Sequence, residues 1–125
     1  MRESGDLAIL RSEYVNEVVS NLIGNALKFS KPGISPIIRI ETTVEDGYHV
    51  ISIHDNGIGV AEEFRENIFK IYQRLHSEAE YKGSGIGLSI CKKIVELHRG
   101  TVWVEDSQLG GSSFIVRLPQ NDLDK

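Results

Sequence analysis

Two stretches of the chain carry apolar residues at the spacing of an amphipathic helix. In the first, which takes Ser12 as its N-cap, apolar residues recur three, four and seven positions apart. The second starts at the glycines of 83–87 and runs to His98 with a similar period. Residues 31–33 and Gly100 are placed to end these two helices. The apolar stripes consist of Val15, Val18, Val19, Leu22, Ala26 and Phe29 in the first helix, and of Ile86, Ile90, Ile94 and Leu97 in the second.

Shorter apolar stretches predict β-strands. Residues 38–42 alternate with polar neighbours, and 50–53 follow after an Asp46-Gly47 turn, which is typical of a hairpin. Helices with one apolar stripe beside such strands indicate two layers, with a sheet covered on one face. The other expected segments are an edge strand or lead-in at 7–10, a short helix at 62–72, a polar loop at 74–84, and strands at 102–104 and 114–118.

Composition narrows the class of protein. The chain has 125 residues, 40% of them hydrophobic and 26% charged, which is typical of one globular domain. Its net charge is −4 without a run of either sign, so it lacks the basic patch of a dedicated nucleic-acid binder. The single cysteine, Cys91, excludes an internal disulfide and suits a cytoplasmic location. No apolar run reaches the ~20 residues of a membrane helix. We therefore expect no direct membrane contact from this chain, whether its parent protein is soluble or membrane-anchored.

Three polar residues of the first helix lie in one column. At 3.6 residues per turn, Asn21 and Asn25 are about 40° apart, and Lys28 returns to within about 20° of Asn21. Two amides and an ammonium group offer oxygen ligands and a cation, which suits a metal-bound phosphate. On spacing alone, a solvated helix face is the favoured interpretation.

Residues 55–59 form a glycine-rich turn that begins with an acid. Asp55 is on the same side of its strand as the apolar Ile51 and Ile53, counting in twos. A carboxylate that faces the core is costly unless a donor meets it, and a ligand amine can be that donor. Gly57 and Gly59 would let the backbone pass close to a flat ring. An ordinary turn after a strand is an equally good interpretation of these five residues alone.

Residues 83–88 are a second glycine-rich segment, at the start of the second long helix. Unpaired amides at a helix N-terminus attract anions. The segment is not a dinucleotide-binding fingerprint, because no strand runs directly into it, and it lacks the lysine of a P-loop. Alone, it is most often a flexible hinge.

Together, these segments resemble the sequence boxes of sensor histidine kinases, in the same order and at the usual spacings. The resemblance covers residues 7–119, and a softer one, at 72–77, is to phytochrome-like kinases. Residues 21–30 resemble the N box, 55–59 the first glycine box, 68–74 the F box with Tyr72 where phenylalanine is usual, 83–88 the second glycine box, and 110–119 the closing strand.

The resemblance implies the Bergerat ATP-binding fold, a two-layer α/β sandwich. In that fold three helices cover one face of a mixed sheet of about five strands. The implied function is that of a catalytic domain that binds ATP and Mg²⁺. It transfers the γ-phosphoryl group to a histidine on a separate dimerisation domain, for relay to the receiver domain of a response regulator. Residues 1–125 are then expected to be this single catalytic domain, with the dimerisation domain absent.

The resemblance also implies where the metal and the phosphates lie. Asn25 would supply an oxygen to Mg²⁺, Lys28 would contact the phosphates, and Asn21 would flank the same site. Residues 60–85 would be a mobile ATP lid, from which Arg74 contacts the γ-phosphate during transfer. Gly83, Gly85 and Gly87 would close this lid over the phosphates, and Ser84 and Leu88 of the same segment would also bind the nucleotide.

The base is implied to lie at the other glycine box. Asp55 would accept a hydrogen bond from the adenine amine, with Gly57 and Gly59 lining the ring. Ser112 stands where a serine or threonine helps to bind adenine, directly or through water. Tyr72 of the F box is assigned to the same nucleotide site.

Two departures bear on the reaction. Asn21 stands where gyrase-type and chaperone-type relatives have a glutamate that activates water, and an amide is no general base. The acceptor is therefore expected to be a better nucleophile than water, although Glu17, one turn earlier, leaves slow hydrolysis open. No histidine of the chain fits a phosphoacceptor: His49 and His54 belong to a strand, His76 to the lid and His98 to a helix end.

Two other functions stay open beside the histidine kinase. One is a regulatory or pseudokinase module that binds ATP without transfer, against which the presence of Asn25, Lys28 and Asp55 argues. The other is a serine kinase of the anti-sigma type. The F box and the long pattern of the second half of the chain favour the histidine kinase.

Overall fold

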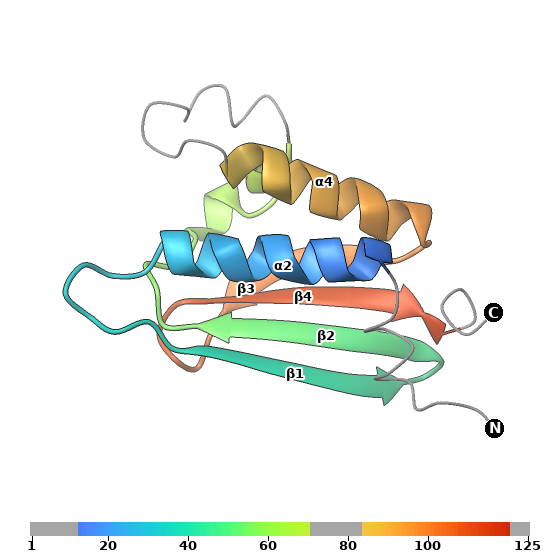
Figure 1. Cartoon of the computed structure of the whole chain (residues 1–125), viewed down its shortest axis with the longest axis horizontal. Helices are drawn as coiled ribbons and strands as arrows, with labels where there is room; N and C mark the ends of the chain where they lie inside the picture. Colours follow the sequence, from blue (N-terminus) through green and yellow to red (C-terminus); the bar gives the residue numbers. More distant parts are fainter. Residues whose placement is uncertain (1–12, 71–83, 121–125) are drawn as a thin grey trace.

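The computed structural model describes residues 13–70 and 84–120. In these ranges helices α2 (Glu13–Lys28) and α4 (Ser84–Leu97) lie on one face of a four-stranded sheet (Figure 1). The predicted two-layer α/β architecture is thus confirmed. No helix within these ranges is long and apolar enough to span a bilayer. The strands are β1 (Ile38–Glu45), β2 (Tyr48–Asp55), β3 (Thr101–Asp106) and β4 (Ser112–Pro119).

The strands lie in the order β1-β2-β4-β3, and their three pairings are all antiparallel. The predicted hairpin turn is present, because Asp46 and Gly47 both have positive φ values, of 52° and 83°, as a two-residue hairpin turn requires. We expected a mixed sheet of about five strands. The described part has four, and the fifth expected strand, at 7–10, lies outside the described residues.

The core lies between the sheet and the two helices. Along β2 every second residue is buried, and these residues face the helices, while their neighbours face the other way. The buried face of α2 contains Val15, Val18, Leu22 and Ala26, as its apolar stripe predicts. The sheet contributes, among others, Ile51, Ile53, Val104, Phe114, Val116 and Leu118 to the same cluster.

The short helix predicted at 62–72 is wrong in type. The structure has two 3₁₀ helices there, η1 (Glu62–Phe64) and η2 (Asn67–Phe69), and residues 71–72 of the predicted helix lie outside the described residues. Phe69 is the only residue of η1 and η2 that is buried, and Phe64 is half exposed. Phe69, with the partly buried Ile68 beside it, gives this charged segment too little packing to hold a longer α-helix.

The apolar stripe predicted for the second helix is partly wrong. Ile94 is in the core, but Ile90 and Leu97 are exposed, whereas Cys91 and Val95 are almost fully buried. The face that packs is therefore rotated from the predicted one. Its members in the core are Leu88, Cys91, Ile94 and Val95.

The end of α4 also differs in detail from the prediction. Arg99 has the left-handed φ of 63° that terminates a helix, and the Gly100 N–H bonds the Val95 carbonyl oxygen at 2.9 Å. Gly100 has another role, because a Cβ there would overlap the backbone of Arg117 and lie 2.9 Å from a methyl group of Leu118.

Candidate functional site

Asp55 ends β2 with a buried carboxylate that points toward the helix layer. Its Oδ1 atom accepts hydrogen bonds from the backbone N–H groups of Gly57 at 2.8 Å and Ser112 at 3.0 Å. Its carbonyl oxygen accepts a third, from the Gly111 N–H, at 3.1 Å. Within the described residues, Oδ2 makes no hydrogen bond. One oxygen is therefore held by the protein, and the other can accept a hydrogen bond from an amino group of a ligand.

Two glycines permit the close packing around this carboxylate. A Cβ on Gly57 would lie 2.5 Å from the Phe29 carbonyl oxygen. A Cβ on Gly111 would overlap Oδ1 of Asp55 and the backbone nitrogen of Gly57. Gly59 has a φ of 78°, which side-chain-bearing residues rarely adopt. These positions are thus restricted to glycine by space or by backbone conformation.

The predicted polar column on α2 forms a second part of the site, beside the Asp55 carboxylate. Asn21 and Asn25 are half buried, and Lys28 is exposed. The Oδ1 atom of Asn25 is buried and finds no hydrogen-bond partner in the part of the chain that the structure describes. A Cβ placed on Gly87 of α4 would lie 3.7 Å from the side chain of Asn21, so the two helices approach one another closely here.

The unpartnered oxygen of Asn25 is the feature that fits a metal ion. A buried acceptor without a donor costs free energy in the protein alone, and a hard cation can satisfy it. Mg²⁺ is held by few protein oxygens and otherwise by phosphates and water, so a single amide oxygen is an adequate donor set. The residues present therefore fit a phosphate-bound Mg²⁺.

Cys91 packs beneath the same column without taking part in chemistry. Burial raises the pKa of its thiol to about 12, and the nearby Glu17 carboxylate acts in the same direction, while a hydrogen bond with Asn21 opposes both. The thiol therefore stays protonated at neutral pH and is no nucleophile. Its place under Asn21 is structural.

Asn56 ties the segment between α2 and β1 to the turn after β2, a role that the sequence analysis missed. Its Oδ1 accepts the Ile37 N–H at 2.8 Å, and its Nδ2 donates to the Ser35 carbonyl oxygen at 3.1 Å. The Ile58 N–H also donates to the Phe29 carbonyl oxygen at 3.0 Å. The segment after α2 is thereby fastened to the turn after β2. The only signal was that asparagine commonly bonds nearby backbone in turns.

A second missed contact anchors the segment before η2. Arg65 Nη2 lies 2.6 Å from Oδ1 of Asp106 at the end of β3, and Arg65 Nε donates to the Val60 carbonyl oxygen at 3.1 Å. The partner is 41 residues away along the chain, so spacing could not reveal it.

Some of the remaining predicted site residues belong to the described part of the chain, and the others do not. Ser112 is buried beside Asp55, and Leu88 is buried in the core cluster. Ser84 and Gly85 are in the first turn of α4. Tyr72, Arg74 and Gly83 lie outside the described residues. The structure thus brings the turn after β2, the start of β4 and the facing parts of α2 and α4 to one end of the sandwich (Figure 1).

Comparison with known proteins identifies the family of this fold. The model of the family described as histidine kinase-, DNA gyrase B-, and HSP90-like ATPase matches residues 11–122. The phytochrome-like protein Cph1 of Synechocystis sp. is 41% identical over 119 residues, which are 94% of this chain and 16% of Cph1. The chain thus spans about a sixth of this relative's length.

Solved structures agree with this result. The nucleotide-free catalytic domain of the histidine kinase ThkA matches with a TM-score of 0.72 and 30% identity, over 86% of this chain and 66% of that one. Full-length ShkA in complex with AMPPNP matches with a TM-score of 0.69 and 27% identity, over 85% of this chain and 21% of that one. The resemblance to sensor histidine kinases is thereby confirmed. The chain belongs to the family of histidine kinase-, DNA gyrase B- and HSP90-like ATPases.

Proposed function

We propose that this chain is the catalytic ATP-binding domain of a sensor histidine kinase, which transfers the γ-phosphoryl group of ATP to a histidine on a separate dimerisation domain. The observation that carries the proposal is a pair of open acceptors at one end of the fold. These are the free Oδ2 of Asp55 and the buried, unpartnered Oδ1 of Asn25, neither of which has a partner within the described residues. ShkA, which has the same fold, was solved with an ATP analogue.

Asp55 would recognise the adenine amine. Two backbone N–H groups hold one carboxylate oxygen, which fixes the direction of the other. A hydrogen bond from a neutral amine to a fixed carboxylate is stronger than one between neutral groups. The close passage of Gly57 and Gly111 leaves no side chain between the carboxylate and a flat ring, and Gly59 and Ser112 complete that wall.

Asn25 would hold Mg²⁺, with Lys28 and the N-terminal turn of α4 receiving the phosphates. When bound, Mg²⁺ neutralises phosphate charge that develops during transfer. Lys28 is exposed at the end of α2, where its ammonium group is available to the phosphates. Backbone N–H groups of the first turn of α4, at Ser84, Gly85 and Gly87, attract anions. We keep Tyr72, Arg74 and Gly83 as proposed contacts from the ATP lid.

Transfer to a histidine rather than to water follows from Asn21. An amide cannot remove a proton from water, so the protein supplies positioning and charge neutralisation but no base. Glu17, one turn earlier, is exposed and lies near Cys91. A neutral imidazole nitrogen attacks without a base, because it already carries a lone pair.

The acceptor histidine would come from another domain. Of the described histidines, His49 is fully buried in the sheet, and His98 bonds the Ile94 carbonyl oxygen at 3.0 Å. His54 is hydrogen-bonded to Ser113 and to Glu41. We therefore propose a histidine-containing dimerisation domain and, downstream, a response regulator receiver domain as partners, with the domain in the cytoplasm.

The test mixes the chain with ATP, Mg²⁺ and a separately produced helical-hairpin domain that carries a phosphoacceptor histidine. We expect acid-labile phosphate on the hairpin, and none on the chain itself. Asn25→Ala should abolish transfer, whereas Ser20→Ala, an exposed change on the same helix, should leave it intact. Nucleotide binding without any transfer would point instead to a regulatory module. Acid-stable phosphate on a serine would point to a serine kinase, and either result would overturn the proposal.

A further inference from the structure

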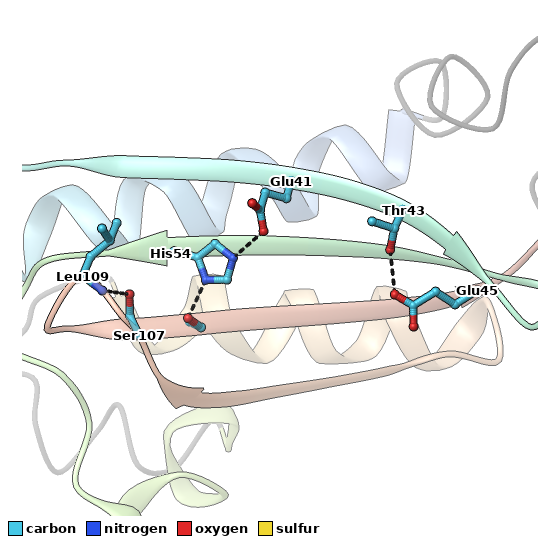
Figure 2. A network of polar contacts seen from close by, with 7 residues as sticks. Glu41, Thr43, Glu45, His54, Ser107 and Leu109 are labelled. Atoms are coloured by element: carbon cyan, nitrogen blue, oxygen red, sulfur yellow. Dashed lines mark hydrogen bonds and ion pairs between the residues drawn. The ribbon is translucent and has the colours of Figure 1, made fainter.

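Three polar side chains form a hydrogen-bonded relay on the sheet face opposite the helices. His54 of β2 has its Nδ1 atom 2.6 Å from Oγ of Ser113 in β4 and its Nε2 atom 3.0 Å from Oε1 of Glu41 in β1 (Figure 2). We name Glu41, His54 and Ser113 the outer relay. Since the carboxylate can only accept, Nε2 carries the proton, and Nδ1 of the neutral ring accepts from the Ser113 hydroxyl group.

The bond between His54 and Ser113 is the protected part of the relay. Ser113 is 2% exposed, while the Glu41 side chain is largely in solvent. A hydrogen bond shielded from water holds its geometry better than one that an exposed carboxylate accepts. The inner bond therefore joins β2 to β4, and the outer bond adds only a weak tie to β1.

The outer relay lies directly behind the base-recognition end of the site. His54 precedes Asp55 on β2, and Ser113 follows Ser112 on β4. Because successive strand residues point to opposite faces, the relay is on one side of the sheet and the site is on the other. In the ladder between β2 and β4, His54 and Ser113 are the last pair at the end that carries the two glycine-rich turns, and beyond them the Gly111 N–H bonds the Asp55 carbonyl oxygen at 3.1 Å. The ends of a ladder open more easily than its centre, so a side-chain hydrogen bond stabilises the pairing of β2 with β4 most at this position.

We propose that His54 is a positioning residue for the nucleotide base. By holding Ser113 at the end of the ladder, it keeps the Ser112 N–H on Oδ1 of Asp55 and so fixes the direction of Oδ2. Of the two N–H groups that hold this carboxylate, the one from Gly57 belongs to the same turn, and only the one from Ser112 depends on the pairing of β2 with β4. The proposal rests on the proposed function, because it assigns the base to Asp55.

Two substitutions of one residue separate the two ends of the imidazole. In His54→Asn, the amide reaches the position of Nδ1, so the bond to Ser113 can persist while the bond to Glu41 is lost. In His54→Gln, the amide nitrogen reaches the position of Nε2, so the bond to Glu41 can persist while the bond to Ser113 is lost. Ser113→Ala breaks the same inner bond from the other strand.

The measurement is the dissociation constant of the 125-residue chain for ATP and for GTP, by calorimetric titration, beside its thermal unfolding. We expect His54→Gln and Ser113→Ala to weaken ATP binding about three- to tenfold, the worth of one hydrogen bond, and to narrow the preference for ATP over GTP. His54→Asn should retain both the affinity and the preference. Thr43→Ala is the matched control, since it removes a hydroxyl hydrogen bond of 3.1 Å from the same face at the far end of the sheet (Figure 2).

The outcomes distinguish this inference from the proposed function. If His54→Gln and Ser113→Ala bound both nucleotides like the unchanged chain, the positioning role would be wrong. It would also be wrong if His54→Asn lost as much preference for ATP as His54→Gln, because the relay would then act only by packing. Asp55→Asn tests the function itself: if it left ATP affinity unchanged, the base would not be read at Asp55 at all. Where a variant melts early, the ratio of the two affinities at low temperature remains the deciding quantity.

Discussion

Gly111→Ala is expected to disrupt the surroundings of the Asp55 carboxylate, the proposed base-recognition end of the site, from the side of β4. A Cβ on Gly111 would overlap Oδ1 of Asp55 and the nitrogen of Gly57, and would lie 2.8 Å from the Asp55 carbonyl oxygen. Ordinary contacts begin at 3.4 Å, so even the mildest of these contacts requires a displacement of 0.6 Å (3.4 − 2.8). The same shift would lengthen the 3.0 Å bond from the Ser112 N–H to Oδ1 to about 3.6 Å, which is no longer a hydrogen bond.

The energetic consequence follows from the charge of the acceptor. A hydrogen bond to a charged group contributes about 1.5–3 kcal/mol. Losing it should lower the midpoint of thermal unfolding by about 5–10 °C in a domain of this size. It should also weaken ATP binding about tenfold or more, since 1.4 kcal/mol corresponds to a factor of ten. Calorimetric titration with ATP and thermal unfolding of the same sample measure the two effects together.

Gly24→Ala is the matched control for this glycine. Gly24 is exposed in α2, and a Cβ there would meet nothing within 4 Å. Alanine is better than glycine in a helix by about 1 kcal/mol, so this variant should melt at a higher temperature and bind ATP unchanged. If Gly111→Ala bound ATP as tightly as the unchanged chain and melted at the same temperature, the packing argument for this end of the site would fail.

Three further predictions concern the core, the thiol and the α2 column. Leu22→Ala, at a fully buried position, should lower the free energy of unfolding in urea by about 2–5 kcal/mol, and a loss below about 1 kcal/mol would mean that the helix does not pack as described. Because burial raises the pKa of Cys91 to about 12 from 9.0, the unfolded chain releases this proton first, so the contribution of Cys91 to stability should fall as pH rises above 9.0. Iodoacetamide should label it only in urea, and rapid labelling of the folded chain at about pH 8 would contradict that burial. Asn25→Leu should raise the melting temperature of the nucleotide-free chain while abolishing transfer to the histidine domain, because it removes a buried oxygen that no described protein group satisfies. A lower melting temperature would show that this oxygen is satisfied after all.

The sequence predicted the first helix better than the second, and the reason lies in their patterns. Most apolar residues of α2 share one face, although Tyr14 and Leu27 are exposed, so Val18 and Leu22 could be assigned to the core without knowledge of a partner. In α4, apolar residues lie on more than one face, so the pattern does not decide whether Ile90 or Cys91 faces the core. The packing of α4 on α2 and η2 decides in favour of Cys91, and such contacts are not visible in a one-dimensional pattern.

For the site, the sequence predicted the acid but not the hydrogen bonds that hold its carboxylate. The alternation of β2 correctly assigned Asp55 to the buried face, because period two is a local property of a strand. The donors to its Oδ1 are another matter, since Ser112 is 57 residues away and bonds through its backbone, which every residue possesses. The tight fit of Gly111 and the bonds of Asn56 depend in the same way on how two turns meet.

One end of the site is formed by backbone groups and the other by side chains, and this predicts opposite changes in stability when the two ends are mutated. The proposed base end consists of backbone N–H groups and glycines at strand ends, where the contacts of Gly111 and Ser112 with Asp55 also join β2 to β4. Changes there should reduce stability and nucleotide affinity in parallel. The proposed phosphate end consists of side chains on helix faces, and its central atom, Oδ1 of Asn25, has no partner among the described residues. A buried acceptor without a partner lowers the stability of the free protein, and a ligand that satisfies it raises that stability on binding. Substitutions there can therefore raise stability while they remove activity, so the sign of the stability change distinguishes the residues that build the fold from those that are kept for the ligand.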